Sequence, residues 1–572
     1  MHLWKKYFII ICITFWGIFS LGIIKKEVQD WAVEVTTARI EERLNSQAEC
    51  LAVCQLLTDE KLPDNPYVKW WYDEETSQNY LFLPGCFEKE MDLIWVFDSF
   101  KQVAIDGKEI ASGDRFELAE GTHTVKIDND VERTLIVLYS ANIASLHIKA
   151  EENALNYIHE SKENAISAEY VLMDESGRIN NYGSIESFRC RGNVSFTDAS
   201  KKSYQFKLNN KSNILGLGED KDWLLISNTF DSTLSRNKIV NTLAKDLEAS
   251  YVPDMDYVDL YINGDYMGNY LLSEKIEIGS DRVNIRDLGE ITENLNANND
   301  LSIYDRVVEE PDKLFSRKWY KIPKEPEFFD GGYLLEIELS DRYGVESSGF
   351  ISSRMQAVVV HSPKYTTLNQ IGFIADIYQD FEDALFSEGG YNPKTERYFY
   401  EYIDMESFAK KYMIEELTKN LDASYSSFFM YKPEYDSKLY AGPVWDYDKA
   451  VGVNMTTNEG IDLRVPEGLY AATLKKDCDV LYGLYQQPEF RMCVQNLCNT
   501  IFADAVDELA DVYIDENMGK IEKSAIMDAY RWSKLEDGDT IDDKIKCFRE
   551  ENSEIKKFLK DRMCYLKKEW KL

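Results

Sequence analysis

The sequence predicts an α+β fold in which a small antiparallel β module, a mixed central domain and a helical C-terminal region follow one another. Short runs of alternating apolar and polar residues between 80 and 148 are typical of half-buried strands. From 167 to 448 such runs are mixed with helical periodicity, which dominates beyond Asn454. A chain of 572 residues is long enough for several domains. We expect a tail and anchor at 1–26, a juxtamembrane helical region at 27–79, the β module at 80–148, the central domain at 150–453 and its helical continuation at 454–572.

The N-terminal segment 7–24 is almost wholly apolar and lies between Lys5-Lys6 and Lys25-Lys26. This length is just enough to cross the hydrocarbon core of a membrane as a helix. A removed export signal is the alternative, but small residues of the Ala-x-Ala type are missing after the segment and an acidic helix-forming stretch, 27–57, follows directly. The sequence therefore predicts a single-pass, membrane-anchored protein whose bulk is extracytoplasmic, because the short tail has no room for a domain.

The composition excludes several classes of function. A formal net charge of −36 argues against a nucleic-acid partner, which needs clustered Lys and Arg. The five His and ten Cys show no zinc-site spacing, and the glycine-rich nucleotide-binding loops of common ATP and NAD proteins are absent. We expect reduced thiols, and chemistry carried by carboxylates and lysines.

Local signals place several elements of the central region. Asp106-Gly107 and Asn263-Gly264 each predict a two-residue hairpin turn, and Glu274 follows the second hairpin closely. The polar, acidic segment 288–327 predicts a long insertion or flexible loop. Asp404 is a predicted helix N-cap. The apolar face of that helix is Phe408, Tyr412, Met413, Leu417 and Leu421.

The stretch from Ala441 to Lys449 reads Ala-Gly-Pro-Val-Trp-Asp-Tyr-Asp-Lys. On an extended strand, Asp446 and Asp448 project to the same face and can reach one hard cation, with Tyr447 turned away. Carboxylate oxygens and a partly open coordination shell suit a magnesium ion that also holds phosphates. The pattern predicts a metal and phosphate site, with a solvated Asp pair at a strand end as the alternative.

Cationic candidates lie upstream. Lys207 is in an apolar strand-forming run whose neighbours Phe206 and Leu208 point the opposite way, so it can neutralise phosphate charge inside a cleft. It can equally be an edge-strand lysine that blocks aggregation. Arg191 and Arg236 are candidate phosphate clamps or ordinary salt-bridge donors.

A third candidate segment follows the Asp404 helix. Asn420 and Asp422 lie two residues apart, in the loop before the strand that holds 426–431. In phosphoryl-transfer sites, the residue that acts as base or metal ligand comes first along the chain and the aspartates that hold the metal come later. This chain shows the same order. The alternative is an ordinary helix C-terminus with an Asx turn.

Seven blocks of sequence, in this order, resemble the spore-coat CotH family over roughly 150–453. They are Arg191-Gly-Asn-Val-Ser195, Lys201-Lys-Ser-Tyr-Gln-Phe-Lys-Leu208, Lys221-Asp-Trp-Leu-Leu225, Leu234-Ser-Arg-Asn237, Val258-Asp-Leu-Tyr-Ile-Asn-Gly-Asp-Tyr-Met-Gly268, Leu271-Leu-Ser-Glu-Lys275 and Gly442-Pro-Val-Trp-Asp-Tyr-Asp448.

The resemblance implies an atypical protein-kinase fold that uses ATP and Mg²⁺ or Mn²⁺ to phosphorylate Ser or Thr of cell-surface or spore-coat proteins. By resemblance, Lys207 is the nucleotide-phosphate lysine, with Lys202 as its rival, and Asp422 is the catalytic-loop aspartate. Asp446 or Asp448 holds the metal, with Asn420 as a further ligand. Arg191 contacts the nucleotide, Glu274 pairs with the lysine or marks the hinge, and Trp445 packs near the base. The catalytic loop, Asn420-Leu-Asp-Ala-Ser-Tyr425, is shorter than in active relatives and poorer in His, Arg and Asn.

Two other readings of the chain stay open. A surface or coat scaffold would keep the fold and bind protein or glycan partners through aromatic faces. A metal-dependent glycosyltransferase would use Trp445 to Asp448 for a nucleotide sugar, which leaves the lysine-bearing strands without a role.

Overall fold

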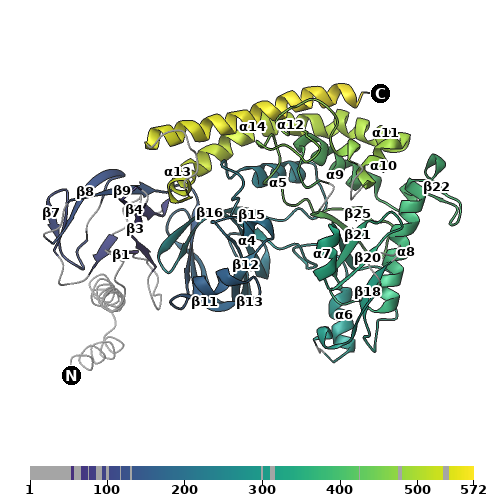
Figure 1. Ribbon diagram of the computed structural model, residues 1–572, viewed down its shortest axis with the longest axis horizontal. Helices are drawn as coiled ribbons and strands as arrows, with labels where there is room; N and C mark the ends of the chain where they lie inside the picture. Colours follow the sequence, from purple (N-terminus) through teal and green to yellow (C-terminus); the bar gives the residue numbers. More distant parts are fainter. Residues whose placement is uncertain are drawn as a thin grey trace, which may run out of the picture. The chain divides into compact units, whose positions relative to one another are not determined.

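The structure is a computed structural model of the chain (Figure 1). It describes residues 53–56, 66–74, 76–85, 93–97, 102–115, 118–128, 132–297, 300–309, 316–423, 426–474, 479–532 and 540–571. The chain divides into two compact units. The first comprises Met1–Ala150, Glu169–Tyr182 and Asp259–Met267, and the second comprises Glu151–Ala168, Gly183–Val258 and Gly268–Leu572.

The first unit contains two sheets, with strand orders β3-β4-β9-β8-β6-β7 and β2-β1-β5. Their strands are β1 (Val53–Leu56), β2 (Tyr67–Lys69), β3 (Trp71–Asp73), β4 (Gln78–Leu83), β5 (Leu93–Val96), β6 (Val103–Ile105), β7 (Lys108–Ile110), β8 (Gly121–Ile127) and β9 (Arg133–Tyr139). The predicted hairpin at Asp106-Gly107 is confirmed, with φ angles of +50° and +77° as a type I′ turn requires. The prediction of a purely antiparallel module is wrong at one place, because β4 and β9 pair in parallel.

The predicted anchor, 7–24, lies outside the described residues. Within the described part of the chain, no helix combines the length and the apolar character that crossing a membrane demands. The helix predicted over 27–57 is wrong where the structure describes it, because Val53–Leu56 is strand β1, paired with β2 and β5. Strands β2 and β3 likewise occupy the end of the region that was predicted to be helical up to 79.

Seven strands form a closed barrel in the order β10-β11-β12-β13-β14-β16-β15. They are β10 (Ala144–Lys149), β11 (Ile166–Met173), β12 (Ile179–Arg191), β13 (Ser203–Asn213), β14 (Glu219–Ile226), β15 (Met255–Ile262) and β16 (Asp265–Glu274). The hairpin at Asn263-Gly264 is confirmed between β15 and β16. On β13, Phe206 and Leu208 are buried while Lys207 points the other way, as strand alternation predicts.

The second unit contains a seven-stranded antiparallel sheet with the order β17-β18-β20-β21-β19-β24-β25. Its strands are β17 (Arg306–Val308), β18 (Arg317–Tyr320), β19 (Tyr333–Glu338), β20 (Ser348–Ile351), β21 (Ala357–Ser362), β24 (Phe428–Lys432) and β25 (Tyr440–Ala441). The strand β19 is buried along its whole length, although it carries Glu336 and Glu338. Burial removes the hydration of a carboxylate, and this cost in free energy has to be offset by hydrogen bonds or opposite charges. Two buried glutamates on one strand therefore mark β19 as a candidate part of a functional site.

The segment 288–327 is not a structureless loop. It contains α6 (Leu288–Leu295), a 3-10 turn at Leu301–Ile303, β17 and β18. The polar composition misled the prediction because α6 is capped by the Asp287 side chain, and β18 is held between its neighbours in the sheet. The remaining short elements of the second unit are α3 (Ala154–Glu160), α4 (Val194–Thr197), α5 (Arg236–Asp246), α7 (Ser340–Val345), β22 (Tyr391–Asn392) and β23 (Arg397–Tyr398).

Helices α8 (Leu368–Leu385) and α9 (Met405–Thr418) pack with β19, β21 and β24 in the main hydrophobic core. As predicted, the Asp404 carboxylate caps α9 by accepting a hydrogen bond of 2.9 Å from Ser407 N. The predicted apolar face is buried in the core up to Leu417, but Leu421 lies beyond the helix, which ends at Thr418.

The C-terminal part is helical, but it begins later than predicted. Residues 454–470 contain no helix, and a 3-10 turn at Ala471–Thr473 precedes the longer helices. These are α10 (Val480–Gln486), α11 (Pro488–Leu497), α12 (Ala503–Glu508), α13 (Ile514–Trp532) and α14 (Ile541–Glu569). Figure 1 shows α14 beside α12 and α13, and its apolar residues join the same core as α9.

Candidate active site

A cavity of about 450 Å³ in the second unit brings most of the chemically interesting residues together. Its volume is in the ordinary range for small-molecule sites. The charged and imidazole side chains that line it are Arg191, Lys275, Glu336, Glu338, Arg342, His361, Asp422, Asp446, Asp448 and Lys449. Its apolar lining comprises Val194, Leu224, Ile226, Phe230, Met255, Ile276, Leu339, Phe429, Val444 and Trp445.

The segment after β25 supplies two of the carboxylates. Its backbone is not the extended strand that we predicted: β25 ends at Ala441, Asp446 has a φ of +67°, and Asp448 lies in a turn. Asp is one of the few residues that accept this left-handed conformation readily. Asp446 and Asp448 nevertheless line the same cavity, because the turn replaces strand alternation as the means of directing both into it.

Tyr447, between the two aspartates, is turned away into the core. Its main-chain N–H donates to Asn237 Oδ1 over 2.7 Å, and its hydroxyl donates to Glu415 Oε1 over 2.6 Å. The Lys411 ammonium bonds both the Tyr447 hydroxyl, at 3.0 Å, and Glu415, at 2.6 Å. A buried tyrosine with satisfied polar contacts fixes the backbone on which Asp446 and Asp448 stand.

The residues after α9 lie beside this turn. The Asn420 amide donates to the Asp446 carbonyl over 3.3 Å and accepts from Asp422 N over 3.2 Å. Asn420 is only 2% exposed and is not among the residues that line the cavity, so the structure does not place this predicted metal ligand among the cavity aspartates. Asp422 does line the cavity, with its Oδ2 3.9 Å from Lys449 Nζ.

The three aspartates carry an unfavourable concentration of negative charge. Burial, and then the charges of Asp446 and Asp422, hold the pKa of Asp448 well above its usual range. Burial also raises the pKa of Asp446 against the opposing effect of Arg191 and Lys449. The pKa of Asp422 is raised by burial and by Asp446, while Lys449 lowers it. A cation bound among them would relieve this repulsion.

The donor set of the cavity fits a divalent ion that shares its shell with a ligand. In the described part of the chain, three acidic groups come within 4.8 Å of one another only at Asp220, Asp222 and Glu277, outside the cavity. Arg282 and Lys275 already pair with that cluster. The cavity aspartates are spread more widely. Magnesium is commonly held by one or two carboxylates together with phosphate oxygens and water, so its site does not require three carboxylates within that distance.

A second acidic group, from the middle of β19, faces the same cavity. Glu336 accepts from Ser427 N over 2.9 Å and bonds His361 Nε2 over 2.5 Å. The Ser427 hydroxyl in turn lies 3.5 Å from Asp446 Oδ2. Burial lowers the pKa of His361, but the hydrogen bond to Glu336 and the charges of Glu336, Glu346 and Glu338 together outweigh this effect and leave the pKa raised.

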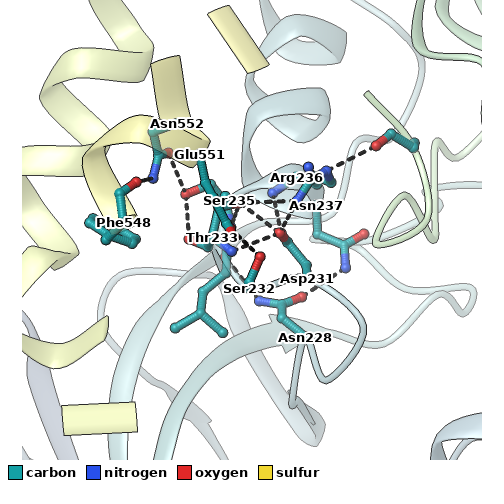
Figure 2. Close-up of polar contacts among 12 residues, drawn as sticks. Asn228, Asp231, Ser232, Thr233, Ser235, Arg236, Asn237, Phe548, Glu551 and Asn552 are labelled. Atoms are coloured by element: carbon teal, nitrogen blue, oxygen red, sulfur yellow. Dashed lines mark hydrogen bonds and ion pairs between the residues drawn. The ribbon is translucent and has the colours of Figure 1, made fainter. Parts of the chain in front are cut away.

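A network at the start of α5 supports the other side of the turn (Figure 2). The buried Asp231 carboxylate accepts from Thr233 and from Arg236, whose guanidinium also forms an ion pair with it. Arg236 Nε donates to the Ala450 carbonyl over 3.0 Å. Arg236 is therefore a salt-bridge donor, one of the two roles predicted for it.

Comparison with known families agrees with this site. The family model described as CotH kinase protein matches residues 188–566, well over half of the chain, and the match contains every residue of the cavity lining. This chain belongs to the CotH kinase protein family. A search of curated proteins finds no match.

In this CotH-family chain, three predicted nucleotide contacts lie outside the cavity lining. Lys207 is 44% exposed and pairs with Glu186 at 3.7 Å. Lys202 Nζ donates to the Phe196 carbonyl over 2.5 Å. Glu274, at the end of β16, is buried and accepts from Asp254 N over 2.6 Å.

Arg191 and Trp445, the other two predicted nucleotide contacts, do line the CotH-family cavity, and the Arg191 guanidinium lies 5.8 Å from the Trp445 indole centroid. Sequence reasoning missed Glu336, His361 and Lys449. The signal for Glu336 was available, because an acidic residue interrupts the apolar run Tyr333-Leu-Leu-Glu-Ile337. Nothing in the sequence marks His361, which reaches the site only because β21 pairs with β19.

Proposed function

We propose that this protein is a membrane-anchored kinase with an atypical protein-kinase fold, which transfers the γ-phosphate of ATP to Ser or Thr of cell-surface or spore-coat proteins. The observation that carries the proposal is the convergence of Asp422, Asp446 and Asp448 with Arg191 and Lys449 on one cavity of a CotH-family domain. Phosphoryl transfer needs this combination, because its catalysis rests on positioning and on neutralising phosphate charge.

Asp446 and Asp448 are the residues that would hold Mg²⁺ or Mn²⁺, since both line the cavity and repel each other without a cation. The ion, when bound, supplies positive charge to the phosphates. Arg191 and Lys449 add fixed positive charge on the protein side. Glu336 and Ser427 orient Asp446 through the contacts described above.

Asp422 is the proposed base. Its pKa is raised by burial and by Asp446, which makes it a better proton acceptor than an ordinary surface aspartate. It takes the proton of the acceptor hydroxyl as that oxygen bonds to the γ-phosphorus. The bond between the γ-phosphorus and the bridging oxygen breaks in the same step, and ADP leaves with that electron pair.

The apolar part of the cavity supports a nucleotide base as the other half of the ligand. Phe429, Trp445 and Ile276 belong to one hydrophobic cluster and all line the cavity. Flat aromatic surfaces bind heterocyclic bases by stacking, and Trp445 also lies next to Arg191.

The place of action follows from the sequence. The apolar segment 7–24 supports a single-pass anchor, and we propose that both units lie on the extracytoplasmic side. The acceptor is then a protein at the cell or spore surface.

The deciding experiment is transfer of labelled phosphate from ATP by the full-length protein in detergent, with Mg²⁺ and then Mn²⁺. Asp422→Asn and Asp446→Asn should abolish transfer, whereas Asp256→Asn should keep it, because Asp256 pairs with Lys520 outside the cavity. An absence of both transfer and any ATP-dependent thermal shift would refute the kinase and favour a scaffold. Preference for a nucleotide sugar over ATP would indicate a glycosyltransferase.

A further inference from the structure

The long helix α14 presents one buried face to the aspartate site. Asn552, Phe558 and Arg562 are at most 6% exposed, and Phe558 and Arg562, four residues apart, lie on the same side of the helix. Lys557 and Lys560, between them, are exposed. The buried residues contact three different segments that carry or support the cavity aspartates.

The first contact is polar and is drawn in Figure 2. Asn552 Oδ1 accepts from the Ser235 hydroxyl over 3.4 Å, and Glu551 accepts from the Ser232 hydroxyl. Both serines lie shortly before Arg236, the first residue of α5, which donates to the Ala450 carbonyl. The helix is thus linked indirectly, through this loop and Arg236, to the backbone two residues after Asp448.

The second contact is a close packing of Phe558 on Gly452. A Cβ added at Gly452 would lie 2.8 Å from the Phe558 ring, and Gly452 has a φ of +69°. Only glycine fits both this approach and this conformation without strain. Phe558 also shares the main core cluster with Tyr447 and Val451, so the ring supports the backbone on which Asp446 and Asp448 stand.

The third contact is an ion pair, fully buried on both sides, with α9. Arg562 Nη2 lies 2.6 Å from Glu416 Oε1, and the guanidinium also donates to the Glu416 carbonyl. Arg562 Nη1 bonds the Pro466 and Gly468 carbonyls, each at 2.6 Å. Glu416 lies two residues before the end of α9, after which come Asn420 and Asp422.

From these contacts we infer that α14 is a positioning element of the aspartate site, and that Phe558 and Arg562 set the separation between Asp422 and the Asp446–Asp448 turn. The effect of α14 on catalysis rests on the proposed function, whereas its effect on the positions of the three aspartates does not.

The reason for such a support is electrostatic. Asp422, Asp446 and Asp448 repel one another, and the direct backbone ties between their segments are few. Those given by the structure are Leu421 N to Lys449 O at 3.2 Å and Val451 N to Thr418 O at 2.7 Å. One rigid helix that touches both segments resists their separation and preorganises the ligands before a cation binds.

The test compares Phe558→Leu with the matched control Phe548→Leu in the full-length protein. Both rings are buried on α14, but Phe548 lies outside the cluster that contains Tyr447 and Val451. We expect Phe558→Leu to weaken Mn²⁺ binding, measured calorimetrically, by roughly ten-fold, as is common when the support of a metal ligand is disturbed. The Mn²⁺ affinity of Phe548→Leu should stay within about two-fold of that of the wild type, although this variant should lose about as much thermal stability as Phe558→Leu.

Hydrogen exchange gives a second readout that needs no activity. Amides of 418–423 and 446–452 should exchange faster in Phe558→Leu than in the wild type, but not in Phe548→Leu. They should also exchange faster in Arg562→Lys, because a lysine ammonium cannot make all the hydrogen bonds of the guanidinium. Equal effects of the two phenylalanine variants on exchange, or no effect of either, would overturn the inference. If the wild type neither binds Mn²⁺ nor transfers phosphate, the proposed function fails while the exchange comparison still decides the role of α14.

Discussion

Asn420 and Asp446 are joined by a hydrogen bond of 3.3 Å from the Asn420 side-chain amide to the Asp446 carbonyl. The same amide accepts from Asp422 N over 3.2 Å. One buried side chain therefore connects the proposed base to the proposed metal ligand, although 24 positions separate them in the sequence. The geometry between these two carboxylates depends on this carboxamide as well as on the surrounding core.

Asn420→Ala should reduce phosphate transfer while the protein stays folded. The variant leaves the Asp446 carbonyl without its donor, which costs about 1–2 kcal/mol of the free energy of unfolding. We expect kcat to fall roughly 10- to 100-fold with a smaller change in KM for ATP, because the residue orients other groups and does not line the cavity. Steady-state kinetics with a denaturation curve check this. Full activity at unchanged stability would contradict it.

Arg191, and not Lys207, should govern ATP affinity. Arg191 lines the cavity beside Trp445, whereas Lys207 is paired with Glu186 and is 44% exposed. Arg191→Met should weaken binding of a non-hydrolysable ATP analogue by about ten-fold or more, since it removes a partly desolvated charge near the phosphates. Lys207→Met is the matched control and should leave the affinity unchanged. Calorimetry in the presence of Mn²⁺ measures both, and the reverse order would restore Lys207 as the phosphate lysine.

The sequence was sufficient to predict the aspartate residues of the site but not their backbone. Asp422, Asp446 and Asp448 were found because carboxylates cluster beside Gly-Pro and Asx signals, which are local. The left-handed φ of Asp446 was not predictable in the same way, because it depends on Tyr447 finding Glu415 and Lys411 in the core. Local patterns thus identified the chemical groups, while the tertiary contacts decided how they are presented.

Residues brought to the site by strand pairing were beyond local patterns. Glu336 and His361 lie on β19 and β21, whose register becomes known only when the sheet forms. The same limit applies to Lys207: strand alternation correctly gave its side of β13, but alternation does not say whether that side faces the cavity or the solvent. Hairpin turns such as Asp106-Gly107 were predicted correctly because two residues alone determine them.

Asp448→Asn should stabilise the protein in the absence of metal. The pKa of Asp448 is raised by burial and by Asp446 and Asp422, so its charged form opposes folding at neutral pH. Neutralising it should increase the free energy of unfolding by on the order of 1 kcal/mol at pH 7.5 in EDTA. The same change should remove the thermal shift caused by Mn²⁺. Asp256→Asn serves as the control, because Asp256 pairs with Lys520 outside the cavity. A less stable Asp448→Asn protein in EDTA would argue against electrostatic repulsion at the site.

Glu274 should make stability fall as the pH rises through the weakly acidic range. Burial raises the pKa of Glu274 from 4.5 to about 7, although the hydrogen bond from Asp254 N and the charge of Arg282 lower it. The folded protein therefore binds more protons than the unfolded chain between these values, and its free energy of unfolding decreases from about pH 4.5 to pH 7. Glu274→Gln keeps an acceptor for Asp254 N and removes this dependence. At pH 8 the variant should be more stable than the wild type by roughly 1–3 kcal/mol, and the difference should disappear near pH 4.5. Chemical denaturation at several pH values, with the exposed Glu554→Gln as control, measures this difference. A Glu274→Gln protein that is less stable than the wild type at pH 8, with a deficit that shrinks as the pH falls, would show that the carboxylate is stabilising in its charged form.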